Sequence, residues 1–474
     1  MSAQPAPTPA PPLAPNPAPP PRRRAGGLSQ APPGGTALFA ARWLTLLAGV
    51  LMGLALLGRT FAYLGLPPLF ISELTIIAGL GLLLFLPGAT AALGTPTLGL
   101  ALVLLAVVAL RTVPYIGTYG FDALRDAVLG GYAVLAIVVA AVLLSSPNLL
   151  PWLIRGYRRF ARLFLCVLPA LWLLSVAGGD ALPTLPWAPD VNTLELKSGD
   201  LAIHLGAIAA MTVLGLSRLH AWYYTALLCV LLGVTGAVSR GGLVGFMLMF
   251  GTAFCLRPKS PWAGRLIIAV LAVLSLAALV NLEVEVPGRE RSFSAQQIVT
   301  NLISVVSDDT DAGDLGDTKA WRLNWWSKIV DYTLFGDYFW TGRGFGVNLA
   351  NVDGFQTEHA DDGLRSPHNG HLSFLARGGV PAFAVWCLLQ VAWLYAVTNG
   401  YYRARRLGDA GWAMTFGLLF CYWLGIMWNA SFDVYLEGPM GGLWYWTVIG
   451  VGVAAARLQV THPQLLRHAD FMPR

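Results

Sequence analysis

Apolar runs long enough to cross a lipid bilayer recur along the chain from about residue 38 to near its last residues. A hydrocarbon core about 30 Å thick requires roughly 20 apolar residues of helix, because in lipid each spanning segment must satisfy its own backbone polar groups. The composition agrees, since 56% of the residues are hydrophobic and only 12% are charged. These runs predict an all-α polytopic membrane protein.

The apolar runs divide into twelve expected transmembrane helices, each about as long as a bilayer requires. They lie at 37–58, 69–87, 97–113, 128–145, 163–178, 200–217, 221–237, 241–256, 265–282, 379–398, 411–428 and 441–457. We therefore expect four parts. These are a disordered Pro-rich cytoplasmic tail (1–36), the first nine helices (37–282), a long outer loop (283–378), and the last three helices with the C-terminus (379–474).

Lysine and arginine set the expected orientation, because cytoplasmic loops of membrane proteins carry an excess of both. With the N-terminus inside, the inner loops receive the basic clusters at 155–162, 257–265 and 401–406, and both termini are cytoplasmic. The net charge of +6 is then a topology signal, and we expect no nucleic-acid partner. The five cysteines lie in apolar runs without a CxxC pair, which indicates neither disulfides nor a zinc site.

One arginine, Arg240, interrupts the apolar stretch 227–256. An arginine at the bilayer centre costs about 2.5–3.5 kcal/mol on insertion scales, so we expect two helices that meet at a tight turn around Ser239. The orientation places Arg240 at the outer boundary, at the start of the second helix. Free N–H groups, the helix dipole and a guanidinium together favour a phosphate site. The alternative is an interfacial arginine whose charge reaches water without a ligand.

The long outer loop begins with an acidic, glycine-containing stretch (304–319), which fits a solvated segment better than a calcium loop. Trp321, Trp325 and Ile329 then recur at helical spacing and predict an amphipathic helix at the membrane surface, with tryptophan as an anchor and sugar stacking as the alternative. Arg322 on this helix would be a second phosphate-binding cation. The glycine-rich "GRGFG" (342–346) lacks the strand–helix context of a nucleotide fingerprint.

His368 lies near the end of the long outer loop, at the level expected for Arg240, and histidine is the side chain best suited to act as a general base near neutral pH. A divalent metal site is the alternative, but the sequence spacing of its candidate ligands fits no standard metal-binding pattern. Its ligands would be His359, Asp361, Asp362, His368 and His371. We therefore expect no metal and no other cofactor.

Four motifs in this order resemble the O-antigen ligase and polymerase superfamily. They are "SRGG" (239–242), "WRLNWW" (321–326), "GRGFG" (342–346) and "PHNGHLSFLARGG" (367–379). The resemblance covers about residues 200–450 and implies a GT-C-like membrane glycosyltransferase at the outer face of a bacterial inner membrane. It further implies a glycan donor carried on undecaprenyl diphosphate, with lipid A–core or another lipid-linked glycan as acceptor.

The resemblance also implies roles for individual residues. Arg240 and Arg322 would stabilise the departing diphosphate, and His368 would take the proton of the acceptor hydroxyl in a single inverting displacement. Further candidates for substrate binding are Ser239, Arg343, Arg365, Asn369, His371 and Arg377. His371 stands where the family commonly has an aromatic residue, so either histidine could be the base. Asp433 and Glu437 could orient the acceptor.

Another class of protein also fits twelve helices, namely a transporter or flippase of lipid-linked sugars. Against it, the sequence shows no repeated half and few charges within the apolar runs, Glu73 being the main one. A structural scaffold leaves the set of two cations and a histidine unexplained. The sequence does not separate a ligase from a polymerase.

Overall fold

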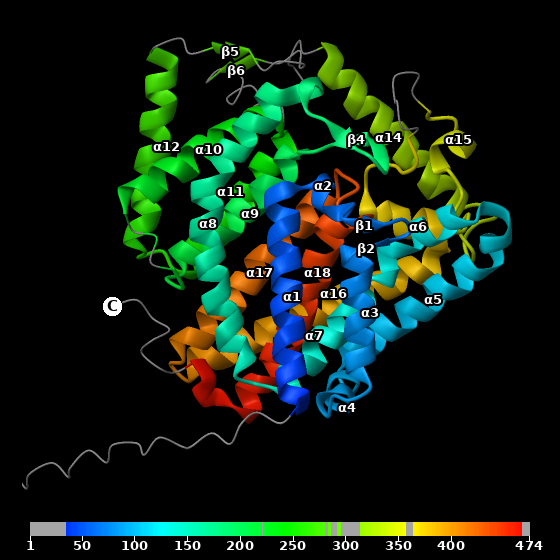
Figure 1. Ribbon diagram of the computed structural model, residues 1–474, viewed down its shortest axis with the longest axis horizontal. Helices are drawn as coiled ribbons and strands as arrows, with labels where there is room; N and C mark the ends of the chain where they lie inside the picture. Colours follow the sequence, from blue (N-terminus) through cyan, green and yellow to red (C-terminus); the bar gives the residue numbers. More distant parts are fainter. Residues whose placement is uncertain are drawn as a thin grey trace, which may run out of the picture.

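The computed structural model of the chain describes residues 35–217, 219, 221–279, 283–285, 292–294, 313–356 and 364–466. Helices dominate, as the apolar runs predict, and the sheets are three two-stranded antiparallel hairpins. The helices pack side by side into a bundle (Figure 1). Most of the expected Pro-rich tail, together with His359, Asp361 and Asp362 of the alternative metal site, lies outside the described residues.

Each of the twelve expected segments coincides with a helix. These helices are α1 (Gly35–Leu57), α3 (Ile71–Leu83), α5 (Pro96–Tyr119), α7 (Ala133–Ser145), α8 (Leu149–Gly178), α9 (Ser198–Val213), α10 (Trp222–Val238), α11 (Arg240–Leu256), α12 (Pro261–Leu279), α16 (Gly370–Arg406), α17 (Ala410–Ala430) and α18 (Pro439–Thr461). One boundary is corrected: the basic cluster 155–162, expected in a loop, lies inside α8.

Among the described residues, five helices are long and apolar enough to cross a membrane, namely α1, α5, α16, α17 and α18. A sixth span results if α6 (Phe121–Gly131) and α7, which are bent by 43° at their junction, count as one. Other apolar helices, such as α3 and α9, have 13 and 16 residues, which rise only about 20–24 Å. The chain is therefore a helical membrane protein, and the number twelve stays a prediction.

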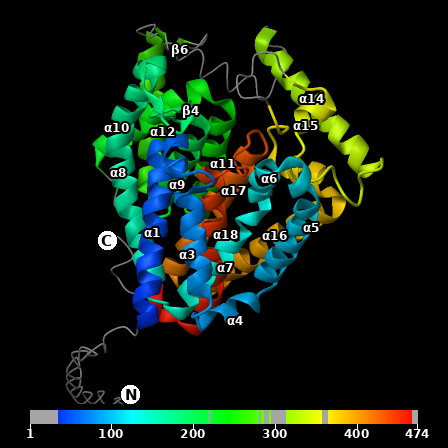
Figure 2. The ribbon, with the colours of Figure 1, turned by 45° about the vertical axis from the view of Figure 1, so that its right-hand side comes forward.

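The remaining elements are short or lie at the ends of the bundle. They are α2 (Arg59–Ala62), α4 (Gly88–Leu93), α14 (Gly313–Leu334), α15 (Leu349–Asp353), the 3-10 turns Gly179–Ala181 and Pro463–Leu466, and the strands β1 (Gly65–Leu66), β2 (Leu69–Phe70), β3 (Thr184–Leu185), β4 (Ala188–Asn192), β5 (Glu283–Glu285) and β6 (Ser292–Ser294). In both ribbon views α14, α15, β4 and β6 lie at the upper end, and α4 lies at the lower end (Figures 1 and 2). Parts of the expected outer loop thus gather at one end of the bundle.

Small residues let the central helices approach closely, as is usual where lipid supplies no hydrophobic drive between helices. A Cβ added at Gly450 of α18 would lie 2.6 Å from the carbonyl oxygen of Ala136 in α7. Gly206 of α9 and Gly425 of α17 both close onto the side chain of Met249 in α11. The middle of α11 is thereby held between α9 and α17.

The amphipathic helix predicted around Trp325 is α14, but its apolar face packs on protein. Trp325 and Ile329 are fully buried in a small second core that they share with Leu349, Ala350 and Leu375. The Trp325 indole donates a 2.8 Å hydrogen bond to the Asp353 carboxylate. The membrane-anchor interpretation is wrong for these two residues, since no part of either side chain is exposed to lipid.

Helix α16 bends sharply where the tenth span was expected to begin. Gly379 has φ 70° and ψ −171°, and Pro381 follows it, so the chain leaves the helical conformation there and loses a backbone donor. The loop from Phe339 to Gly344 fills the break: Arg343 N–H donates to Ala376 O, and Gly344 N–H donates to Arg377 O, at 2.7 and 2.9 Å. Residues 370–378 therefore form a separate helical segment above the expected span.

Candidate active site

The turn around Ser239 has the predicted form. Helix α10 ends at Val238, α11 begins at Arg240, and the Ser239 hydroxyl accepts a 3.1 Å hydrogen bond from Gly242 N–H. Ser239 is thus the N-cap of α11, which satisfies one of its free donors. Arg240 occupies the first position of the helix, where the dipole is positive.

This turn packs against the loop between α17 and α18, residues 431–438. The Trp428 indole at the end of α17 donates a 2.8 Å hydrogen bond to Gly241 O. A Cβ added at Gly241 would lie 4.0 Å from the Cβ of Phe432. The start of α11 therefore lies against the first residues of the loop, which brings Arg240 to that end of the bundle.

Arg322 of α14 reaches the same loop. Its Nη1 donates to the carbonyl oxygen of Phe432 at 3.3 Å, and the ring of Trp326 lies 6.3 Å from the Phe432 ring. Burial lowers the pKa of Arg322, while the nearby Asp433 carboxylate acts in the opposite direction. A guanidinium remains protonated in proteins all the same, so a fixed positive charge stands beside Phe432.

His368 belongs to a third element, the segment that immediately precedes α16. Its side chain is 29% exposed, and its Nδ1 lies 3.8 Å from Oδ1 of Asp433. With φ 50°, His368 is the one non-glycine residue with a left-handed backbone among those described. The conformation is held on both sides: Pro367 O accepts from the Trp326 indole at 2.8 Å, and Asn369 caps α16. Such strain costs about 1–3 kcal/mol and gathers at functional sites.

Asp433 ties this group of residues together, and Lys197 is a member that the motifs did not predict. The Lys197 ammonium lies 3.3 Å from Oδ1 of Asp433, which also accepts from Val434 N–H at 2.7 Å. Burial raises the pKa of Asp433, but His368 and Lys197 outweigh burial and hold it well below its usual range. Burial lowers the pKa of Lys197, but Asp433 and Asp200 more than reverse this. Both groups are therefore charged at neutral pH.

Residues from four distant segments thus converge at Phe432 and Asp433: the α11 start, Arg322, His368 and Lys197. The Lys197 ammonium and the His368 ring lie beside the partly buried Asp433 carboxylate. Two further cationic residues, Arg322 and Arg240, belong to segments that contact the adjacent Phe432. The local excess of positive charge, together with a helix N-terminus, suits a phosphate-bearing ligand. We name Arg240, Arg322, His368, Asp433 and Lys197 the convergence site.

Asn369 and His371 lie beside the convergence site, but both side chains have structural partners. The Asn369 side-chain oxygen accepts from His371 N–H and Leu372 N–H at 3.0 and 3.1 Å. The His371 ring uses both nitrogens: Nδ1 lies 3.2 Å from the Trp386 indole nitrogen, and Nε2 lies 3.2 Å from Met427 O. An indole only donates and a carbonyl only accepts, so the network assigns a neutral ring with its proton on Nε2.

Three other expected substrate-binding residues, the arginines at 343, 365 and 377, are in ion pairs. Arg377 is only 1% exposed and lies 2.8 Å from Asp126 of α6, so it is a buried ion-pair partner and not a surface charge. Arg365 lies 3.1 Å from each of Asp122 and Asp126, again in α6. Arg343 pairs with Asp353 at 3.1 Å. Each joins elements of the protein, and a role in substrate binding stays a prediction.

Glu437 stands at the far end of the α17–α18 loop. The Ser373 hydroxyl donates a 2.5 Å hydrogen bond to its Oε1. Burial raises its pKa, although Arg377 and hydrogen bonds from Ser373 and Ser366 oppose this. The partners of Glu437 are thus Arg377, Ser373 and Ser366, and none of them belongs to the convergence site.

Within the part of the chain that the structure describes, no three His, Cys, Asp or Glu side chains come together as a metal site would require. Since His359, Asp361 and Asp362 lie outside that part, the expectation of no metal stays a prediction.

Part of the chain matches a known protein family. Residues 225–387 match the family model described as O-antigen ligase, and no curated protein matches the chain. The matched stretch includes Ser239, Arg240, Arg322 and His368, whereas Lys197 and Asp433 lie outside it. The match indicates a membrane enzyme of the O-antigen ligase or polymerase type. The resemblance predicted from the four motifs is confirmed, because residues 225–387 carry the sequence pattern of the O-antigen ligase family.

Proposed function

We propose that the protein is a glycosyltransferase that moves a glycan from undecaprenyl diphosphate to an acceptor at the periplasmic face of the bacterial inner membrane. The observation that carries the proposal is the meeting of the α11 turn, Arg322 and His368 at two adjacent residues, Phe432 and Asp433. These groups come from three separate segments of the chain, at positions 240, 322 and 368, and their chemistry is that required by transfer from a diphosphate.

Arg240 and Arg322 would bind the diphosphate. The leaving group gains negative charge in the transition state, and fixed cations placed there lower the barrier; loss of one such group typically costs about 10²–10³ in rate. The N-terminus of α11 adds backbone N–H donors. No general acid is then needed on the leaving side, because a diphosphate departs without protonation.

His368 would act as the base on the acceptor hydroxyl. Its side chain is partly exposed and one edge faces Asp433, so the other edge is available to an acceptor. Asp433, which is ionised, would stabilise the imidazolium that forms. His371 is less suitable, since both of its ring nitrogens are engaged by Trp386 and Met427. One displacement at the anomeric carbon inverts its configuration, and no step calls for a metal ion.

The proposed membrane arrangement has twelve spans, with both termini in the cytoplasm and the long loop outside. Short apolar helices such as α9 and α11 would cross by packing against longer neighbours, where the bilayer adapts to a modest mismatch at low cost. The acceptor is either lipid A–core, in a ligase, or a second lipid-linked glycan, in a polymerase. A deletion strain separates the two, since a ligase mutant retains unattached polymer and a polymerase mutant carries single repeats.

The test uses full-length protein in proteoliposomes with undecaprenyl diphosphate-linked glycan and acceptor. We expect Arg322→Ala and His368→Ala to lower kcat by at least about 10²-fold each. His462→Ala, which changes a residue just beyond the end of α18 opposite the α17–α18 loop, should retain full activity. Normal transfer by either site variant would remove that residue from the mechanism. Movement of the lipid across the vesicle without bond formation would favour the flippase instead, and loss of activity in EDTA restored by a divalent ion would overturn the metal-free mechanism.

A further inference from the structure

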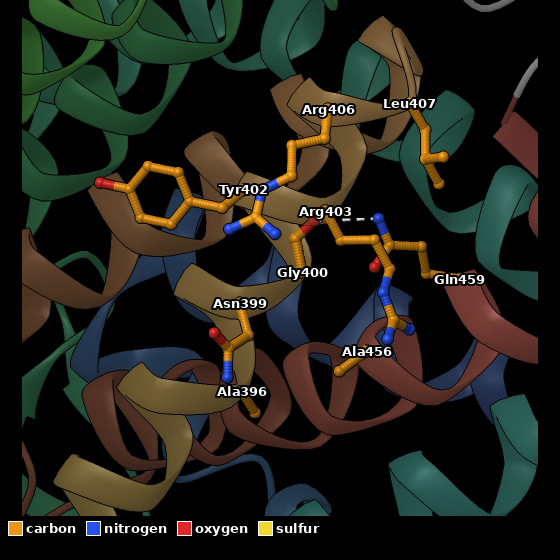
Figure 3. Close-up of a pocket in the computed structure, with 9 residues that line it drawn as sticks. All are labelled: Ala396, Asn399, Gly400, Tyr402, Arg403, Arg406, Leu407, Ala456 and Gln459. Carbon is orange, nitrogen blue, oxygen red and sulfur yellow. Dashed lines mark hydrogen bonds between the residues drawn. The ribbon is translucent and has the colours of Figure 1, made fainter.

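A second cationic site lies at the other end of α16. There a pocket of about 580 Å³ is lined by α16 and α18, together with Leu407. Figure 3 shows Asn399, Arg403 and Arg406 on successive turns of α16, with Ala456 and Gln459 of α18 across from them. From the kink at Gly379 to Arg406 the helix rises about 40 Å, roughly a whole bilayer with its headgroups. The pocket and the convergence site therefore face opposite membrane surfaces.

The pocket carries positive charge without a balancing acid. None of its nine described lining residues is Asp or Glu, while Arg403 and Arg406 both contribute guanidinium groups. Both arginines are exposed, so their charges are available to a ligand. Guanidinium groups bind phosphate oxygens through paired hydrogen bonds, and the Asn399 amide adds further donors. The lining thus suits a phosphate group.

The shape of the pocket is built into the helix packing. Gly400 lies at its base, where a Cβ would stand 2.5 Å from the Phe416 ring, so only glycine lets α16 approach α17 here. The Gln459 amide, which is buried, donates a 2.9 Å hydrogen bond to Gly400 O across the pocket. Ala396 and Ala456 leave room where larger side chains would fill the space. The cavity is therefore a fixed feature of the α16–α18 junction.

An apolar stripe leads along α16 to the pocket. Leu388, Val391, Tyr395 and Tyr402 are 55%, 62%, 70% and 60% exposed, and their spacing places them on one side of the helix. Tyrosines at the end of such a stripe are typical of the membrane–water boundary. A molecule bound at Arg406 would lie at the lower end of this lipid-facing surface, which favours a ligand with an acyl chain over a soluble anion.

We propose that the pocket binds the phosphate headgroup of an anionic phospholipid, in the leaflet opposite the convergence site. The phosphate contacts Arg403 and Arg406, and the acyl chains follow the exposed stripe of α16 toward Leu388. The inference rests on the lining and exposure of this pocket and not on the reaction proposed above.

The test measures lipid retained by the detergent-solubilised full-length protein in native mass spectrometry, with phosphatidylglycerol or phosphatidylcholine added. We expect the wild-type protein to retain more phosphatidylglycerol than phosphatidylcholine. Arg403→Ala/Arg406→Ala should weaken retention about tenfold or more. Arg405→Ala is the matched control, because Arg405 is exposed in the same turn but does not line the pocket. Arg403→Lys/Arg406→Lys should fall between, since lysine keeps the charge without the paired hydrogen bonds.

Added inorganic phosphate distinguishes the two sources of the ligand. If millimolar phosphate leaves phosphatidylglycerol bound, the lipid is the ligand, as proposed. If it displaces the lipid, the pocket binds a soluble anion and the lipid proposal is overturned. Equal retention by the double variant and Arg405→Ala would overturn the proposal, as would equal binding of the two lipids. Size-exclusion profiles and unfolding temperatures matched to wild type exclude misfolding as the cause of lost retention.

Discussion

At the scale of single residues, the most informative position is Asp433. It contacts Lys197 at 3.3 Å and His368 at 3.8 Å, and its pKa lies well below the usual range despite burial, because these two neighbours favour the carboxylate. Asp433 is therefore ionised throughout the pH range in which an imidazole titrates. The carboxylate therefore places a fixed negative charge beside the His368 ring.

Asp433→Asn should lower the rate of transfer. The substitution removes the negative charge that would stabilise the imidazolium formed when His368 takes the proton of the acceptor, so kcat falls. The fall is smaller than the about 10²–10⁴ expected for loss of the base itself. Asp331→Asn, which changes an exposed carboxylate on α14, is the control and should leave kcat unchanged. An unchanged kcat in Asp433→Asn would show that the carboxylate does not act on the base.

The motifs predicted part of this site and could not predict the rest. Arg240, Arg322 and His368 were recognised because each stands in a short pattern with its own chemistry. Lys197 was missed, since its partner Asp433 is 236 residues away and only the packing of α9 against α17 brings the two together. The local signal was its place at the outer start of an expected span, in "LKSGD", which fits many surface lysines equally well.

At the scale of elements, the joint between α6 and α16 explains the arginines that sequence reasoning assigned to substrate. Asp126 of α6 is buried and accepts from both Arg365 and Arg377. Gly346 O also accepts from Arg365, and Val347 O from Arg377, at 3.0 Å each. These contacts fix the segment 370–378, and with it the position of His368. Sequence alone shows the charge of an arginine but not which carboxylate it meets.

Arg377→Met should therefore destabilise the protein more than it disturbs chemistry. It leaves the buried Asp126 with one arginine fewer, and breaking a buried ion pair costs about 3–5 kcal/mol. Arg125→Met is the matched control, because Arg125 contacts the same carboxylate at 3.8 Å with its side chain 45% exposed, and such pairs contribute about 0–1 kcal/mol. Thermal unfolding in detergent measures both. Equal unfolding temperatures with lost activity in Arg377→Met would instead support the substrate-binding role.

At the scale of the whole molecule, the positions of the helices were predictable and their membrane role less so. Every expected apolar segment is helical, because a long run of residues with high mean hydropathy must be buried and must satisfy its own backbone hydrogen bonds. It does not distinguish burial in lipid from burial in protein. In α9 every described side chain is buried, and α7 is nearly so, which explains why short segments in the centre of the bundle are as apolar as longer ones such as α5.

The molecule has two cationic sites at opposite ends of α16. The convergence site combines cations with a histidine and a carboxylate, whereas the polar residues that line the pocket at Arg403 and Arg406 are arginines, amides and one tyrosine. Both suit phosphate, but only the first has groups that can move a proton. A lipid diphosphate that reacts should therefore occupy the first site.

The most direct measurement is an experimental structure of the full-length protein with undecaprenyl diphosphate bound. We predict the diphosphate between Arg240 and Arg322, with guanidinium nitrogens about 2.7–2.9 Å from its oxygens and with His368 on the side of the reacting sugar carbon. A diphosphate bound elsewhere, for example against Arg403 and Arg406, or contacting neither Arg240 nor Arg322, would contradict the proposed active site.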